Sequence, residues 1–118
     1  MDNIFKSVLE QDRAPVVICS SGHTVVYMNP AAKAYYHRDL TGESILGCHN
    51  EKSNEAIRKV VAWFHKSPEN NVVHTFFNAK QNKDVYMVAL RGEDGGLIAY
   101  YEKHEFRAAD ETPLYEMK

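Results

Sequence analysis

The stretch DRAPVVICSSGHTVVYMNPAAKAYY, residues 12–36, decides the fold of this chain. Two runs rich in β-branched residues, 16–20 and 23–28, flank a Ser-Gly pair that is a common turn signal. Asn29 follows the second run and precedes Pro30, and an asparagine cap with proline at the first helical position is typical of a helix start. The stretch therefore predicts an antiparallel pair of strands that leads directly into a short helix.

Helical patterns lie on both sides of this stretch. On its amino-terminal side, residues 3–11 have the spacing of a short amphipathic helix, which is stable only when it docks on another element. On its carboxyl-terminal side, residues 41–46 predict a helical turn capped by Thr41, and residues 54–66 predict a longer helix capped by Ser53. We expect the longer helix to lie on a sheet, because it carries an apolar stripe made of Ile57, Val60, Val61 and Phe64.

Three β-rich runs follow the long helix, at residues 71–79, 83–91 and 96–106, with turn signals between them. The order of elements along the chain is two strands, a helical middle and three strands. This order predicts an α+β domain with one antiparallel sheet. The last two strands are apolar on both faces, whereas a sheet covered on one face only would alternate apolar with polar residues. We therefore expect the amino-terminal helix or a second copy of the chain to cover the second face. We predict a homodimer in which residues 3–10 and this outer sheet face are buried.

Composition and charge exclude several classes of protein. A chain of 118 residues with a formal net charge of −2 has the size of one domain and lacks a basic surface for nucleic acid. It has no apolar run that could span a membrane and no signal-peptide core, which predicts a cytoplasmic protein that does not bind membranes. We expect an amphipathic helix at residues 1–12, a folded domain at 13–107 and a loose tail at 108–118.

The chain resembles a PAS domain over nearly its whole length. Residues 12–36 resemble the PAS opening, in which a hairpin leads through Asn-Pro-Ala into the first helix, and MVALRGEDGGLIAYYE, residues 87–102, resembles the closing hairpin. The resemblance implies a five-stranded antiparallel sheet of order 2-1-5-4-3, with helices over one face that enclose a small cavity. It also implies that this cavity binds haem, flavin or a small metabolite, and that the opposite sheet face serves dimerisation or signal output.

The loop GCHNEKS, residues 47–53, more narrowly resembles that of a bacterial group of PAS modules with Cys-His-Pro-Pro-Lys-Ser ahead of a long helix. The chain keeps the first two and the last two of these residues, but it has Asn50-Glu51 in place of the two prolines. Some members of the group are regarded as haem sensors. His49 is therefore the candidate metal ligand if a haem is bound, with Cys48 beside it. The alternative is that the loop only packs around the start of the helix.

The candidate ligand-binding residues combine this loop with aromatic and other side chains elsewhere: His49, Cys48, Tyr35, Trp63, His74, Phe76 and Met87. Aromatic side chains dominate any small core, so several of these residues have a purely structural alternative. His74 faces either the cavity or solvent, depending on the register of its strand. We expect His104, which lies among charged residues near the end of the chain, to be exposed.

Three functions from different classes follow from these observations. The favoured one is a sensory or signalling module that binds a small ligand or cofactor in its cavity and signals through its dimer or partner surface. The second is a ligand-free module for dimerisation or protein interaction, whose own side chains fill the cavity. The third is a thiol enzyme at Cys48, with His49 as the activating base. Because the chain has no GxGxxG, HExxH or nucleophile-elbow motif, we expect that it is not an enzyme.

Overall fold

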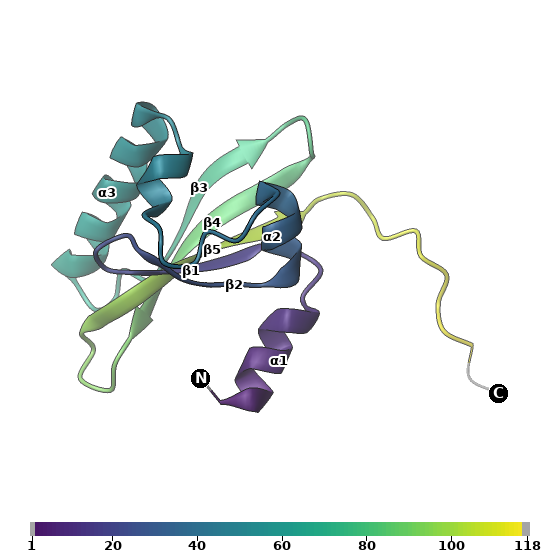
Figure 1. Cartoon of the computed structure of the whole chain (residues 1–118), viewed down its shortest axis with the longest axis horizontal. Helices are drawn as coiled ribbons and strands as arrows, with labels where there is room; N and C mark the ends of the chain where they lie inside the picture. Colours follow the sequence, from purple (N-terminus) through teal and green to yellow (C-terminus); the bar gives the residue numbers. More distant parts are fainter. Residues whose placement is uncertain (1, 117–118) are drawn as a thin grey trace.

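A five-stranded antiparallel sheet forms the centre of the protein in the computed structural model, which describes residues 2–116. The strands lie in the order β2-β1-β5-β4-β3 (Figure 1), so the fold class and the strand order predicted from the sequence are confirmed. Their bounds are β1 (Val16–Ser20), β2 (Val25–Met28), β3 (Val72–Asn78), β4 (Lys83–Arg91) and β5 (Leu97–Phe106).

Helices cover one face of this sheet, which we call the inner face: α2 (Pro30–Tyr36), the 3-10 helix η1 (Ile45–Cys48) and α3 (Glu51–Lys66) (Figure 1). Helix α2 contacts β1 and β2, whereas α3 contacts β4 and β5. The amino-terminal helix α1 (Asn3–Gln11) lies beside the opposite, outer face, where it lines a pocket together with Val16 and Tyr101.

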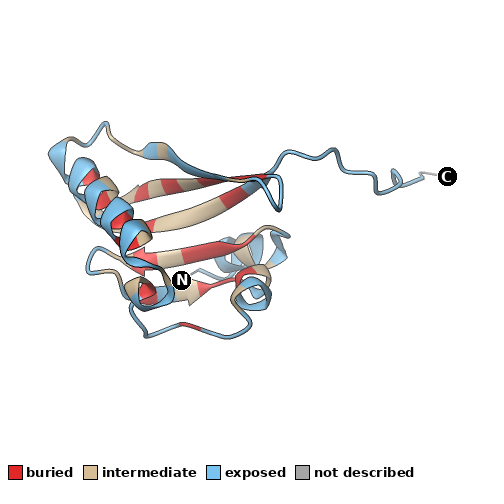
Figure 2. Ribbon diagram, turned by 90° about the horizontal axis from the view of Figure 1, so that it is seen from above, coloured by how far each residue is buried: buried red, intermediate tan, exposed pale blue. Residues whose placement is uncertain are grey.

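The hydrophobic core lies between the inner face and the covering helices. Figure 2 shows buried positions along the strands and on one side of α3. The predicted apolar stripe of α3 is confirmed, since Ile57, Val61 and Phe64 are buried and Val60 packs against them. Phe64 is completely buried, and Met87 and Tyr100 meet the helices from the sheet side of the same cluster.

Two helix starts differ from the sequence prediction. Helix α3 begins earlier than expected, because Asn50 rather than Ser53 is its N-cap and accepts a hydrogen bond of 2.8 Å from the Ser53 amide. The predicted turn capped by Thr41 is instead a 3-10 helix capped by Ser44, whose hydroxyl accepts from the Leu46 amide. In each case a cap-forming side chain nearer the observed start satisfies a free amide of the first turn.

Asn29 joins the amino-terminal segment to the sheet and to α2. Its side chain is completely buried, and its amide nitrogen donates to the carbonyls of Leu9, Asp12 and Ala14 at 3.0, 3.3 and 3.0 Å. Its amide oxygen accepts from the Val16 and Ala32 amides, both at 2.9 Å. One side chain therefore fixes the end of α1, the first residue of β1 and the start of α2 relative to one another.

The outer face is only partly covered. Helix α1 lies over the side of the sheet formed by β2 and β1, where the hydroxyl of Tyr27 in β2 donates to the Glu10 carboxylate at 2.5 Å. Farther along the sheet, Val72 of β3 pairs with outer-face Val88 and remains 58% exposed to solvent. The apolar face of α1 is exposed as well, at Ile4, Phe5 and Val8.

Candidate functional site

Polar side chains gather on the inner face of β4 and β5, beneath α2. Lys83 and His104 are diagonal neighbours on the two strands, because Lys83 pairs with Phe106 and His104 pairs with Val85. Side chains two residues apart on a strand share a face, so Glu102 lies on the same side as His104. We call Lys83, Glu102 and His104, with Tyr35 of α2 above them, the inner polar cluster.

His104 is almost completely enclosed, with only 3% of its side chain exposed. Its Nε2 atom lies 3.3 Å from a carboxylate oxygen of Glu102. Because an ionised carboxylate only accepts hydrogen bonds, Nε2 carries a proton, and Nδ1 acts as an acceptor when the ring holds this single proton. This Nδ1 atom is buried and has no hydrogen-bond partner among the described residues.

Lys83 is also buried, with 1% of its surface exposed. Its ammonium nitrogen lies 3.9 Å from the centre of the Tyr35 ring, and the same ring contacts His104 edge-on at 5.5 Å between ring centres. Burial lowers the pKa of Lys83, and the negative charge of Glu102 opposes that change. Within residues 2–116 we find no hydrogen bond or ion pair to this ammonium group, so its polar contacts are limited to the face of an aromatic ring.

The interior next to the inner polar cluster contains tyrosine and cysteine side chains. Burial raises the pKa of Tyr36, and the charge of Glu102 raises it further. On the next inner-face position of β5, the Tyr100 hydroxyl lies 2.8 Å from Nδ1 of His23. Burial raises the pKa of the neighbouring Cys19 thiol to about 12, so this thiol stays protonated at neutral pH. All of these groups are uncharged, and the formal charge of the interior is concentrated in the inner polar cluster.

The loop residues proposed from the sequence lie apart from the inner polar cluster. Cys48 is exposed, whereas His49 is half-buried, with its ring 6.3 Å from that of Tyr36. Nδ1 of His49 lies 3.0 Å from the Ile45 carbonyl oxygen. A carbonyl only accepts, so Nδ1 carries the proton and Nε2 is left as an acceptor or ligand nitrogen.

The other predicted site residues are divided among several places. Tyr35 belongs to the inner polar cluster, and Met87 is buried beside it because it pairs with Glu102 across the sheet. Phe76 pairs with Val85 and shares the inner face, but it is 59% exposed. Trp63 lies on α3 and is 37% exposed.

His74 lies on the outer face, away from the predicted cavity. It stacks on Tyr86, with 4.8 Å between the ring centres, and its Nε2 atom lies 2.8 Å from the Asp84 carboxylate. The Arg107 guanidinium binds the same carboxylate through two nitrogens, at 2.7 and 2.8 Å. The side chain of His74 is 45% exposed, so its surroundings are those of a surface histidine in an ion-pair network.

Lys83, Glu102 and His104 were missed from the sequence, and the expectation that His104 is exposed is wrong. The register of β5 buries it, because His104 is four residues from buried Tyr100 and therefore faces the same side of the sheet. Strict alternation counted from the apolar positions of the strand predicts that His104 faces inward. The charged residues around it suggested an exposed position instead.

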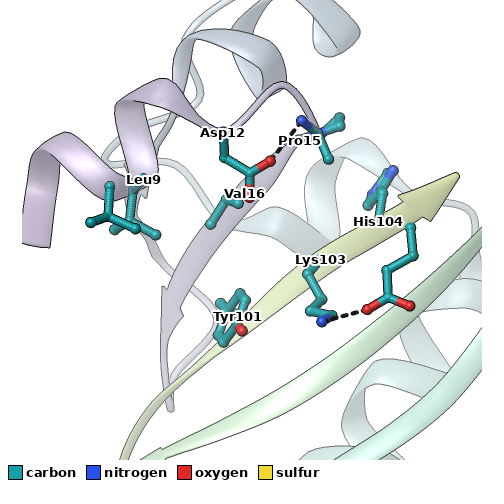
Figure 3. A pocket seen from close by; sticks show the side chains of 10 residues that line it. Leu9, Asp12, Pro15, Val16, Tyr101, Lys103 and His104 are labelled. Carbon is teal, nitrogen blue, oxygen red and sulfur yellow. Dashed lines mark hydrogen bonds and ion pairs between the residues drawn. The ribbon is translucent and has the colours of Figure 1, made fainter. Parts of the chain in front are cut away.

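Two pockets within residues 2–116 lie against α1. One of about 420 Å³ is lined by Leu9 of α1 and by Val16, Tyr101 and Lys103 of the outer face (Figure 3). Lys103 forms an ion pair of 2.7 Å with Glu105 at its edge (Figure 3). This pocket lies on the side of the sheet opposite to the cavity that the sequence predicts.

The residues near His49 do not fit a haem. Its free Nε2 atom has the chemistry of an axial ligand, but neither of the two pockets beside α1 borders it. Tyr36, whose ring lies beside His49, packs against the hydrophobic core. Within residues 2–116, no three His, Cys, Asp or Glu side chains are arranged to hold a metal ion. None of the helices in that part of the chain has the length and apolar character needed to cross a membrane.

Comparison with known proteins finds the same architecture in solved structures. The C-terminal domain of a Streptococcus mutans protein is 18% identical, with a TM-score of 0.68 over 86% of this chain and 81% of that one. A PAS domain from Colwellia psychrerythraea is 11% identical, with a TM-score of 0.67 over 88% and 97%. A sensory box sensor histidine kinase from Vibrio cholerae is 12% identical, with a TM-score of 0.62 over 86% of both chains. No protein-family model and no curated protein sequence matches the chain.

Proposed function

We propose that this chain, which has the PAS fold, is a sensory module that binds a small molecule between its inner sheet face and α2. The fold is the one that residues 12–36 and 87–102 predicted from the sequence, and the similar solved structures share it. Solved structures with this fold include a sensor histidine kinase, which supports a role in signalling.

The observation that carries the proposal is the inner polar cluster. His104 is buried, and its Nδ1 atom lacks a hydrogen-bond partner within residues 2–116. The side chain of Lys83 is buried beside it, with its ammonium group against the face of the Tyr35 ring. A buried polar group without a partner lowers the free energy of unfolding by about 1–3 kcal/mol. A module that only dimerised would be more stable with apolar residues at these positions, so their presence favours a ligand.

Asn29 supplies a route from this site to the outer face. Helix α2 carries Tyr35, which covers the inner polar cluster, and it begins at Asn29. The side chain of Asn29 also holds the carbonyls of Leu9 and Asp12 at the end of α1. A displacement of α2 on ligand binding would therefore be passed to α1, whose apolar face is exposed for a partner or a second copy of the chain.

The test is to identify a bound molecule directly. The protein is purified without denaturation, its mass is measured by native mass spectrometry, and its absorption spectrum is recorded between the near ultraviolet and the red. We expect a small-molecule adduct that is released on denaturation, without the Soret band of a haem. A preparation that carries no adduct, and whose thermal stability is unchanged by a broad metabolite panel, would contradict the sensory role.

A ligand-free interaction module is the second candidate. The observation in its favour is the packed apolar interior, in which Phe64, Met87 and Tyr100 already fill space between the sheet and the helices. The same experiment separates the two candidates, because a ligand-free module carries no adduct in native mass spectrometry. The thiol-enzyme alternative has less support: Cys48 is exposed, and no hydrogen bond joins it to His49 among the described residues.

A further inference from the structure

The inner polar cluster has unused hydrogen-bonding capacity of two kinds. The Lys83 ammonium can donate three hydrogen bonds and has no acceptor among residues 2–116, and Nδ1 of His104 is a buried acceptor without a donor. Both atoms belong to side chains on adjacent strands and the same face, and both side chains contact the Tyr35 ring. A ligand group that fits here must accept from a cation and share a proton with an imidazole nitrogen.

We propose that the inner polar cluster binds the carboxyl group of a small apolar acid, with Tyr35 as the side chain that moves to admit it. One carboxylate oxygen accepts from the Lys83 ammonium, and the other shares a proton with Nδ1 of His104. This inference rests on the proposed function and adds the chemical class of the ligand.

The charges of the cluster favour a carboxyl group over other acceptors. Glu102 already binds Nε2 of His104, so it stabilises the imidazolium that forms when a second carboxylate approaches Nδ1. The titratable groups that face His104 are Glu102 on its own strand, Lys83 on β4 and Tyr35 on α2. A phosphate can carry one more negative charge than a carboxylate, and this extra charge close to Glu102 is unfavourable in a poorly solvated site. A neutral amide has the same shape as a carboxyl group but forgoes the charge-assisted hydrogen bond to Lys83.

Tyr35 controls access to these groups. Its ring lies 3.9 Å from the Lys83 ammonium and edge-on to His104, so it covers both. The residue itself is 37% exposed, on the solvent side of a helix of seven residues. A change of rotamer at this one side chain would uncover the cluster without disturbing the hydrophobic core.

The apolar part of the ligand has a surface beside the cluster. Phe76, Val85 and His104 lie opposite one another on β3, β4 and β5, so they form one row across the inner face. Phe76 is 59% exposed at the open end of this row. A carboxyl group held at Lys83 would therefore direct the body of an aromatic or aliphatic acid along the row toward Phe76.

The experiment uses titration calorimetry with matched charged and neutral probes: phenylacetate and hexanoate, each compared with its amide. The wild type is compared with Lys83→Met and with the control Lys80→Met, whose exposed lysine lies in the turn before β4. We expect the acids to bind the wild type and the control, and to bind Lys83→Met more weakly by about tenfold or more. In the wild type, each acid should bind more tightly than its amide by about the same factor. Binding takes up a proton at His104, so the measured enthalpy should depend on the ionisation enthalpy of the buffer.

A second variant keeps the proposal open to refutation if Lys83→Met folds poorly. Tyr35→Ala removes the cover, so we expect faster association of phenylacetate in stopped-flow measurements. Amides that bind as well as acids, an unchanged affinity in Lys83→Met, or loss of binding in Tyr35→Ala would each overturn the proposal. A neutral molecule found by native mass spectrometry would overturn the carboxyl assignment and leave the sensory role intact, whereas the absence of any bound molecule and of any probe binding would overturn both.

Discussion

At the scale of single residues, the ammonium group of Lys83 contributes one favourable and one unfavourable free-energy term. Its contact with the face of Tyr35 is a cation–π interaction, worth up to about 2 kcal/mol in a desolvated site. Removing a charged ammonium from water costs several kcal/mol, which is more than this contact returns. The lowered pKa of Lys83 agrees in sign, because it shows that the folded protein disfavours the charged form.

We predict that Lys83→Met stabilises the ligand-free protein. Methionine has a similar length and no charge to desolvate, so the free energy of unfolding should rise by about 1–3 kcal/mol. Urea denaturation at neutral pH measures this change. Lys80→Met, at an exposed position of the same hairpin, should leave the midpoint unchanged. Destabilisation by Lys83→Met would mean that the ammonium has a stabilising partner.

The same residue predicts a dependence on pH. Because the pKa of Lys83 is lowered on folding, the unfolded chain holds its proton in the interval just below pH 10.5, where the folded chain has released it. The contribution of Lys83 to stability therefore rises with pH across this interval. We expect the stability advantage of Lys83→Met to shrink as the pH is raised toward 10.5 in a series of urea titrations. Cys19 and the buried tyrosines titrate in both proteins, so their effects cancel in the difference, and a constant difference would argue against the burial of Lys83.

Single residues also show where prediction of the site from sequence fails. Strict alternation along β3 would put His74 and Phe76 on one face. The strand instead has a bulge between them, so His74 pairs with Tyr86 on the outer face and Phe76 with Val85 on the inner face. Nothing in the local sequence fixes the position of such a bulge, which is why the role of His74 could not be decided in advance.

At the scale of elements, the turn and periodicity signals predicted every strand and the three α-helices close to their observed bounds. These signals are local, which is why they can be read from sequence. The start of α3 was less well determined because Asn50 and Ser53 are both good cap residues. The path of the preceding loop decides between them, and that path depends on tertiary packing.

Helix capping gives a direct check of this start. Asn50→Ala removes the acceptor of the Ser53 amide and should lower the free energy of unfolding by about 1 kcal/mol. Ser53→Ala lies inside the first turn and should change it by less than about 0.5 kcal/mol. Thermal or urea unfolding of the two variants measures both values. A larger effect at Ser53 than at Asn50 would restore the start predicted from sequence.

At the scale of the whole molecule, the exposed apolar face of α1 and the uncovered outer sheet face predict a homodimer. Phe5 is 68% exposed and Val8 65%, and apolar exposure of this kind on a docked helix indicates a binding surface. We expect the wild type to be a dimer in light scattering coupled to gel filtration, and Phe5→Glu or Val8→Glu to be monomeric. Leu9 is a poorer test residue, because its carbonyl accepts from buried Asn29.

The control for this prediction is Asn3→Glu, which adds the same negative charge at the start of α1, where the helix dipole tolerates it. This variant should remain a dimer. A wild type that is monomeric at high concentration would refute the dimer, and monomerisation by Asn3→Glu would show that charge rather than apolar contact is responsible.

The strand order has a consequence for how the chain reaches this structure. Strand β1 lies between β2 and β5, and Val17 pairs with Glu102, so the centre of the sheet joins the two ends of the sequence. Contacts of such high contact order form slowly, because a long loop must close before they are made. During synthesis on the ribosome, the β1–β2 hairpin leaves one edge of β1 unpaired until residues 97–106 have emerged. Until then Val17 and Cys19 lack the neighbouring strand, and the nascent chain is most exposed to aggregation and chaperone binding.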